Sequence, residues 1–289
     1  MPISGYLPVD NAINHSEWGK LAERTVRYLE SCRVADGGYY FARITPGSPH
    51  DTFYAVAALQ LLGVGPVKPD GVVEFFQGLL RREALQTPAA VFFTVSSLAL
   101  LGRLDSKWSV LGKKLQRIQD PEGGFWIPKY LWVEAASRLT NTYYAVGALT
   151  RLNMPFRREE CARLVARELN SVLATGELDS LATVYYGIEI LTLLEQPFPV
   201  ETDIILPYLE NVSGEAGFLE HWYYVTAIYR HLGKTPRFFK KVVDFTLGCE
   251  RTRGGFARSP SPCAISTVIY TFYAVEIMQA LGLLKKIYW

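Results

Sequence analysis

The chain has 289 residues, a formal net charge of +2 and 49% apolar residues, the composition of an ordinary globular protein with a large core. The near-neutral charge argues against a dedicated nucleic-acid surface, and no run of about 18 apolar residues suggests a membrane span. The four cysteines form no close pairs, and the N-terminal sequence lacks the basic and apolar regions of a secretory signal. We therefore expect a cytoplasmic protein with free thiols.

Amphipathic stretches with charged residues on one side recur along the chain, the pattern of helices with one face in water. In chain order they cover residues 16–32, 70–83, 106–118, 158–172 and 237–250. The stretches between them are apolar nearly all round, which is typical of buried helices. Each of these contains two adjacent aromatic residues, of which the second is Tyr54, Phe93, Tyr144, Tyr186, Tyr224 or Tyr273. We expect outer and inner helices to alternate.

The inner stretches are copies of one another. Thr-Phe-Tyr-Ala-Val at 52–56 returns unchanged at 271–275, and residues 142–146 differ from it at one position. The copies are spaced about 40–50 residues apart, a period at which repeated units bury their apolar faces against neighbouring units. Six copies predict about twelve helices in a single domain over residues 1–289.

Turn residues mark the ends of both kinds of helix. The outer helices are followed by Gly37-Gly38, Gly123-Gly124, Gly217 and Gly254-Gly255, and the inner helices by Gly63, Gly102, Asn153, Gly233 and Gly282. Glycine and asparagine tolerate the positive φ that stops a helix at such positions. Near the starts of the inner helices, Asp51, Asn141 and Thr183 are residue types that cap helix N-termini.

Helix-pair repeats form either an open superhelix with a concave surface or a closed ring. The apolar, Tyr- and Phe-rich inner helices favour the ring, because an open superhelix exposes more polar residues on one face. We therefore predict an all-α fold, an (α/α)6 barrel or toroid, in which six inner helices surround a central cavity.

The Gly-Gly-aromatic turn, the variable loop and the motif Asp/Asn-Thr-aromatic-Tyr-Ala-Val together resemble the repeat of protein prenyltransferase β subunits. Squalene cyclase and other class II terpene cyclases share the related toroid. The resemblance spans most of the chain, from residue 15 to residue 285. It implies an apolar cavity that holds an isoprenoid chain, and a separate helical-repeat α subunit as partner.

The resemblance also implies a metal site. Family β subunits bind zinc through an Asp-x-Cys pair at the start of one inner helix and a His at the start of the next. Asp179 and His221 match these positions, but Leu181 stands in place of the cysteine. Because catalytic zinc needs three protein ligands, Cys263 is the candidate for the third. Zinc and magnesium are the candidate cofactors, although the Asp-rich motifs of terpene cyclases and synthases are absent.

In the expected ring, every inner helix begins at the same end, where its unpaired N–H groups favour anions. Cations that suit a diphosphate lie in or near the loops at this end, namely Arg43, Lys129, Arg138 and Arg258. Candidates for acid–base catalysis at the same end are Asp51, Asp179, Glu220 and His221. The side chains expected to line the isoprenoid are Tyr54, Tyr144, Tyr186, Tyr224 and Tyr273.

These features predict a protein that binds an isoprenyl diphosphate in a central aromatic cavity. Prenyl transfer without the full zinc triad is the favoured activity, and whether the chain is an enzyme stays open. Alternatives are a terpene-cyclase-like enzyme with an unfamiliar acid and a non-catalytic isoprenoid-binding or scaffold protein. A carbohydrate-active (α/α)6 enzyme with paired carboxylates is the remaining alternative.

Overall fold

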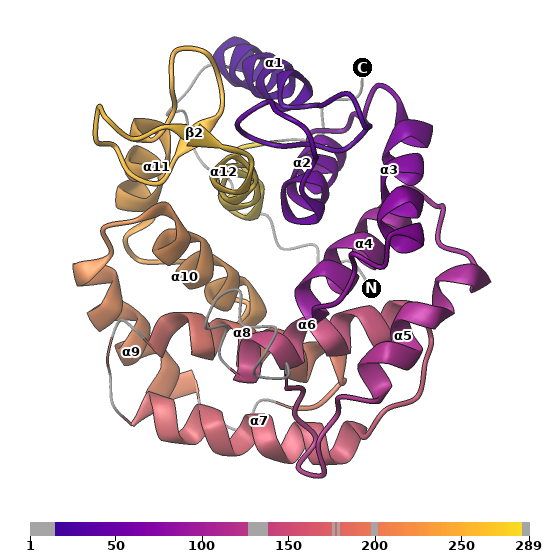
Figure 1. Cartoon of the computed structure of the whole chain (residues 1–289). Helices are drawn as coiled ribbons and strands as arrows, with labels where there is room; N and C mark the ends of the chain where they lie inside the picture. The colour runs from indigo at the N-terminus through magenta and orange to yellow at the C-terminus, as the bar shows by residue number, and fades with distance from the viewer. Residues whose placement is uncertain (1–14, 127–137, 175–176, 178–179, 198–201, 285–289) are drawn as a thin grey trace. The chain divides into compact units, whose positions relative to one another are not determined.

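The computed structural model describes residues 15–126, 138–174, 177, 180–197 and 202–284 (Figure 1). These residues form twelve α-helices, one short 3-10 helix and one antiparallel pair of two-residue strands. No helix in these ranges is long and apolar enough to cross a membrane. The chain divides into two compact units, residues 1–75 with 217–289, and residues 76–216.

The first unit joins the two ends of the chain. Its elements are α1 (His15–Ser31), α2 (Pro49–Leu61), the start of α3 (Pro69–Arg81), α10 (Leu219–His231), α11 (Phe239–Gly248), β1 (Phe256–Ala257), β2 (Ser266–Thr267) and α12 (Val268–Ala280). The last inner helix, α12, packs against both the first inner helix, α2, and against α10 (Figure 1). The β1–β2 hairpin and α11 pack against α12 as well.

Contacts within the first unit join the first and last helix pairs of the chain. Arg24 of α1 forms a salt bridge to Glu250, just after α11, over 2.7 Å. Gly254 approaches α1 so closely that a Cβ there would lie 2.5 Å from the carbonyl oxygen of Arg24. The first and last helix pairs of the chain are therefore neighbours within this unit.

The second unit contains the remaining elements. They are α4 (Pro88–Leu100), η1 (Ser106–Trp108), α5 (Ser109–Gln116), α6 (Arg138–Arg151), α7 (Arg158–Leu173), α8 (Leu181–Leu193) and α9 (Thr202–Glu215). The inner helix α6 packs against both α4 and α8, and the outer helix α7 packs against α8 and α9. The sequence patterns do not predict helix α9. Its interior contains Pro207, a residue type that is unfavourable inside a helix and so hides the helix in the sequence.

The inner helices begin one turn earlier than the sequence suggests. The N-caps of α2, α4 and α12 are Ser48, Thr87 and Thr267, whose hydroxyls accept backbone N–H groups. Pro49 follows Ser48 at a position where its fixed φ suits the first helical turn. The predicted capping roles of Asp51, Asn141 and Thr183 are therefore wrong, because these residues lie inside α2, α6 and α8.

The predicted helix stops are mostly confirmed. Gly63, Gly102, Gly233, Gly282 and Asn153 all adopt a positive φ directly after inner helices. Helix α8 ends at a residue type that the sequence does not single out, because Glu195 takes the left-handed conformation there, with a φ of 57°.

Candidate functional site

Each strong copy of the repeat ties its Gly-Gly turn to its inner helix through one buried threonine. The hydroxyl oxygens of Thr52, Thr142 and Thr271 accept the N–H groups of Tyr39, Phe125 and Phe256, over 2.9, 3.2 and 3.0 Å respectively. Each of these N–H groups belongs to the aromatic residue that follows the turn. The bond holds the loop over the first turn of the inner helix, so loop and helix side chains come together there.

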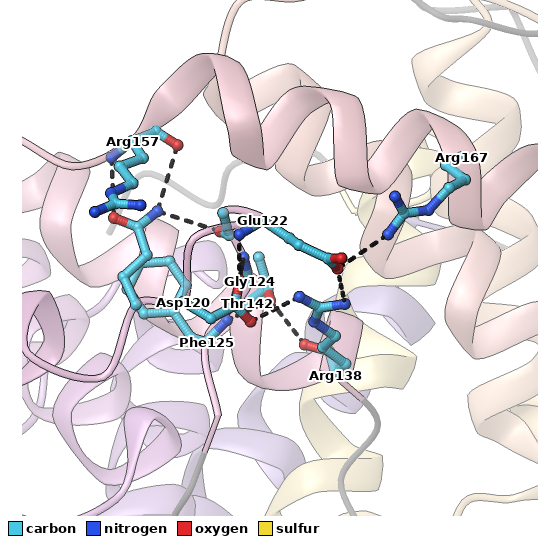
Figure 2. Close-up of polar contacts among 10 residues, drawn as sticks. Asp120, Glu122, Gly124, Phe125, Arg138, Thr142, Arg157 and Arg167 are labelled. Atoms are coloured by element: carbon cyan, nitrogen blue, oxygen red, sulfur yellow. Dashed lines mark hydrogen bonds and ion pairs between the residues drawn. The ribbon is translucent and has the colours of Figure 1, made fainter.

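In the second unit, the predicted diphosphate ligand Arg138 is held by carboxylates (Figure 2). Its Nη2 donates to Asp120 Oδ2 over 2.6 Å, and its Nη1 donates to Glu122 Oε2 over 2.9 Å. Hydrogen bonds from Arg138 and from Arg167 lower the pKa of Glu122. Asp120 also accepts the N–H groups of Glu122 and Gly124. Arg138 therefore fastens the turn to the start of α6, with both terminal nitrogens bound to carboxylates.

In the first unit, Glu220 and Arg258 form a salt bridge at the start of α10. Nε and Nη2 of Arg258 both donate to Glu220 Oε1, over 2.7 and 2.6 Å. These hydrogen bonds raise the pKa of the Arg258 guanidinium. The guanidinium carbon lies 3.8 Å from the ring centroid of Phe218, and the backbone carbonyl of Arg258 accepts the N–H of Leu219. A predicted diphosphate ligand and a predicted acid–base residue are thus joined.

Two further side chains belong to this site. His221 lies in the first turn of α10, and its ring centroid is 5.4 Å from that of Phe218. Tyr270 lies in the first turn of α12, where burial, with the nearby charge of Glu220, raises the pKa of its hydroxyl. We call Phe218, Glu220, His221, Arg258 and Tyr270 the α10 cluster. Sequence reasoning missed Phe218 and Tyr270, although an aromatic residue directly after Gly217 follows the pattern of the other turns.

Asp51 is buried, 5% exposed, and holds the loop that precedes α2. Its Oδ2 accepts the N–H of Phe41 over 3.0 Å, and Nδ1 of His50 lies 3.2 Å from its Oδ1. The His50 ring also contacts Tyr54, with centroids 4.7 Å apart. Asp51 therefore connects the loop to the aromatic side chains of α2.

Arg43 differs from the other predicted cations of the described residues. It lies in the loop before α2, where Nε and Nη2 donate to the hydroxyl of Ser31, and its guanidinium carbon lies 5.7 Å from the Tyr28 ring centroid. Within the described residues, no carboxylate forms an ion pair with Arg43, whereas Arg138 and Arg258 are paired. Arg43 is also exposed, so its charge is accessible to an anion.

The inner helices of the first unit bring an aromatic cluster together. Tyr223 and Tyr273 stack with centroids 4.2 Å apart, and Tyr54 lies 5.9 Å from Tyr273. The further members are Phe53, Tyr224 and Phe272. Helices α10 and α12 run parallel, because Tyr223 meets Tyr273 near their starts and Arg230 pairs with Glu276 nearer their ends.

Neighbouring residues of α10 lie on different faces of the helix and pack against different partners. Trp222 is fully buried and packs against Phe245 of the outer helix α11, with centroids 5.9 Å apart. Tyr223 and Tyr224 turn to the aromatic cluster and, like Phe53, remain partly exposed. The cluster is therefore not a sealed core, and part of its aromatic surface is accessible.

The second unit has an aromatic cluster of its own on α4, α6 and α8. Its members are Phe92, Phe93, Tyr143, Tyr144, Tyr185 and Tyr186. Tyr143 lies 5.3 Å from Phe92 and 5.2 Å from Tyr186, so α6 links the other two helices. Of the predicted lining residues, Tyr144 and Tyr186 belong to this cluster, and Tyr54, Tyr224 and Tyr273 to that of the first unit.

The zinc site that the resemblance implies does not fit the side chains present. Leu181 begins α8 at the position of the family cysteine, and its aliphatic side chain is buried, 1% exposed. Cys263 is exposed, and Asp179 and Lys129 lie outside the described residues. Among the residues that are described, no three His, Cys, Asp or Glu side chains come together as metal ligands. We assign no reaction step to a metal.

The buried cysteines predict a loss of stability at alkaline pH. Burial raises the pKa of Cys161 and of Cys249 to about 12, whereas an unfolded chain ionises its thiols from about pH 8.5. The two protonated thiols contribute fully to the free energy of unfolding below that pH. As pH rises above it, the free energy of unfolding falls by up to about 1.4 kcal/mol per thiol per pH unit. We expect the urea midpoint to fall between pH 8 and pH 10, and to fall less in Cys161→Val. Cys263→Ser, at the exposed cysteine, serves as control; a Cys161→Val slope equal to that of the control would contradict the prediction.

Comparisons with known proteins identify the family. The family model of the prenyltransferase alpha-alpha toroid domain matches residues 9–82 and 70–288. The chain belongs to this family. The predicted all-α toroid is thereby confirmed, and a comparison with curated protein sequences gives no match.

Solved structures agree on the toroid. This prenyltransferase-family chain is similar to Candida albicans protein geranylgeranyltransferase-I complexed with GGPP, at 11% identity and a TM-score of 0.63, over 90% of this chain and 91% of that one. It is also similar to a type II terpene cyclase from Scytonema in complex with geranylgeranyl dihydroxybenzoate, at 12% identity and a TM-score of 0.56, over 93% of this chain and 98% of that one. At these identities the likeness shows the fold alone.

Proposed function

We propose that this toroid binds an isoprenyl diphosphate and transfers its prenyl group without zinc. The observation that carries the proposal is the partly exposed aromatic cluster on α2, α10 and α12. Aromatic walls suit a polyene chain, and their faces stabilise the allylic cation that develops when diphosphate leaves. The isoprenoid tail would lie against the partly exposed Phe53, Tyr223 and Tyr224, which pack on the buried rings of Tyr54 and Tyr273.

Arg43 is the side chain that we assign to the diphosphate. It is exposed and carries no carboxylate partner within the described part of the chain, so its fork can meet phosphate oxygens. Arg138 and Arg258 already donate to carboxylates, which makes them weaker candidates. Lys129 and Asp179, outside the described residues, stay predictions.

Both similar solved structures are complexes with a geranylgeranyl compound, GGPP in one and geranylgeranyl dihydroxybenzoate in the other. We therefore propose geranylgeranyl diphosphate as the first ligand to test, with farnesyl diphosphate beside it. The cytoplasmic location and the separate α subunit stay predictions, and co-purification of a helical-repeat partner would test the latter.

The test is a titration of the purified chain with geranylgeranyl diphosphate, followed by intrinsic tryptophan fluorescence. We expect saturable binding that Arg43→Asn weakens about tenfold or more, because hydrogen bonds to a charged group contribute about 1.5–3 kcal/mol. Asparagine tolerates the positive φ of 58° at this position. Geranylgeraniol lacks the diphosphate, so its affinity should not change in Arg43→Asn.

Arg27→Gln, at an exposed arginine of α1, is the matched control and should bind like the unmodified chain. No saturable binding of either diphosphate would reject the proposal. Binding with no transfer to any acceptor would instead favour a non-catalytic isoprenoid carrier. Leu181, which stands in place of the family cysteine, supports that alternative.

A further inference from the structure

We infer that the α10 cluster holds the prenyl acceptor, and that this acceptor presents a neutral O–H group to Oε2 of Glu220. The inference rests on the proposed function, because an acceptor requires a bound prenyl donor. It assigns a carboxylate, in place of a metal, to the activation of the acceptor.

The two oxygens of Glu220 have unequal surroundings. Oε1 accepts both hydrogen bonds from Arg258, whereas Oε2 is buried from solvent and has no hydrogen-bond partner among the described residues. Only 16% of the side chain is exposed. A buried carboxylate oxygen without a donor is unfavourable, so the site is suited to a ligand that supplies one.

The position of Glu220 is fixed from several sides. The guanidinium of Arg258 lies on the ring of Phe218, 3.8 Å from its centroid, and points its donors at Oε1. The backbone of Arg258 accepts the N–H of Leu219, which joins the end of β1 to the start of α10. Both donors of Arg258 go to one carboxylate oxygen. If the carboxylate rotates, the two oxygens exchange places and one of them is again without a donor. The unpartnered oxygen is therefore a built feature of the cluster.

The chemistry selects the acceptor class. A carboxylate repels an anionic nucleophile such as a thiolate, but it accepts a hydrogen bond from an alcohol, a phenol or water. In the transfer step, the acceptor oxygen bonds to C1 of the isoprenyl chain while the bond from C1 to the diphosphate oxygen breaks. The diphosphate leaves with the electron pair, and the acceptor proton passes to Oε2 of Glu220.

The location of the cluster agrees with this role. Tyr270 of the cluster and Tyr273 of the aromatic cluster belong to the same helix, with ring centroids 6.1 Å apart. An acceptor at Glu220 therefore lies beside the aromatic side chains to which we assign the isoprenoid tail. Burial raises the pKa of the Tyr270 hydroxyl above its ordinary value.

The experiment uses water and phenol as acceptors, with the full chain and geranylgeranyl diphosphate. We measure released diphosphate together with geranylgeraniol and the geranylgeranyl phenyl product. Glu220→Ala should lower both rates about 100-fold, the low end of what a positioned general base contributes, and should not weaken the affinity for geranylgeranyl diphosphate. Added formate should restore part of the rate in Glu220→Ala but not in Glu220→Gln, whose amide fills the same space.

Glu250→Ala is the matched control, since Glu250 is also paired with an arginine in the first unit but lies outside the cluster. Its rates should equal those of the unmodified chain. If Glu220→Ala does not fold, Glu220→Gln, which keeps the side-chain shape, must show the same loss with geranylgeranyl diphosphate still bound.

Undiminished rates in the Glu220 variants would overturn the inference. A loss that formate does not restore would make Glu220 a structural residue and would overturn it too. If the unmodified chain binds geranylgeranyl diphosphate but transfers nothing to water or phenol, the inference fails and the binding proposal survives. If the diphosphate does not bind at all, the proposed function itself fails.

Discussion

Gly123→Ala is expected to destabilise the chain by about 3 kcal/mol or more, among the larger effects of single substitutions. Gly123 has a φ of 94°, beyond the small left-handed region that other residues adopt. A Cβ there would lie 2.7 Å from Cα of Cys161 and still closer to the backbone N of Cys161 and the carbonyl carbon of Glu160. These are backbone atoms of α7, so the clash is relieved only by moving the helix.

Gly102→Ala is the matched control. Gly102 also has a positive φ, 65°, but no atom lies within 4 Å of a Cβ built on it. Only the left-handed backbone then opposes the substitution, at about 1 kcal/mol. Urea unfolding of both variants at one pH separates the two effects. Equal losses of unfolding free energy in the two variants would show that the clash with α7 adds nothing to the cost of Gly123→Ala.

The close approach at Gly123 belongs to a repeated arrangement. Cβ atoms at Gly37, Gly123 and Gly254 would meet the backbones of α3, α7 and α1, in each case a different outer helix from the one that precedes the turn. The sequence predicts the positive φ of these glycines from their place after a helix. It does not predict the contact with the next helix, because that contact depends on how successive pairs pack.

Most of the fold could be predicted because the repeat encodes it several times. Inner helices recur as apolar aromatic stretches, and the glycines after them adopt the predicted φ. Helix starts were misplaced, because Ser48, Thr87 and Thr267 lie outside the repeated motif. The single domain over residues 1–289 stays a prediction.

The candidate site could be predicted only residue by residue. Glu220 and Arg258 stand out as charges near inner-helix starts, but they are far apart in sequence, and only the packing of the β1–β2 hairpin beside α10 joins them. Arg138 likewise looks like a free cation until the fold places Asp120 and Glu122 around it. Ion pairing between distant loops leaves no periodic pattern in the sequence, so the residues could be named beforehand but their pairing could not.

Thr142→Val should cost about 2 kcal/mol, although valine has the same shape as threonine. Thr142 and Phe125 are both fully buried, and the threonine oxygen accepts the N–H of Phe125 over 3.2 Å. Valine leaves that N–H buried without an acceptor, and the cost is the desolvation of an unsatisfied donor. Urea unfolding gives the free energy, and hydrogen exchange at Phe125 should accelerate.

Thr246→Val provides the control, because Thr246 is equally buried but its hydroxyl only donates to the carbonyl of Val242 within α11. That carbonyl keeps its place in the helix, so the loss should stay below about 1 kcal/mol. The double variant Gly123→Ala/Thr142→Val should lose less unfolding free energy than the sum of the two single losses, because displacing the turn already breaks the Thr142 bond. Full additivity would mean that the threonine does not hold the turn, and the repeated threonine would then need another explanation.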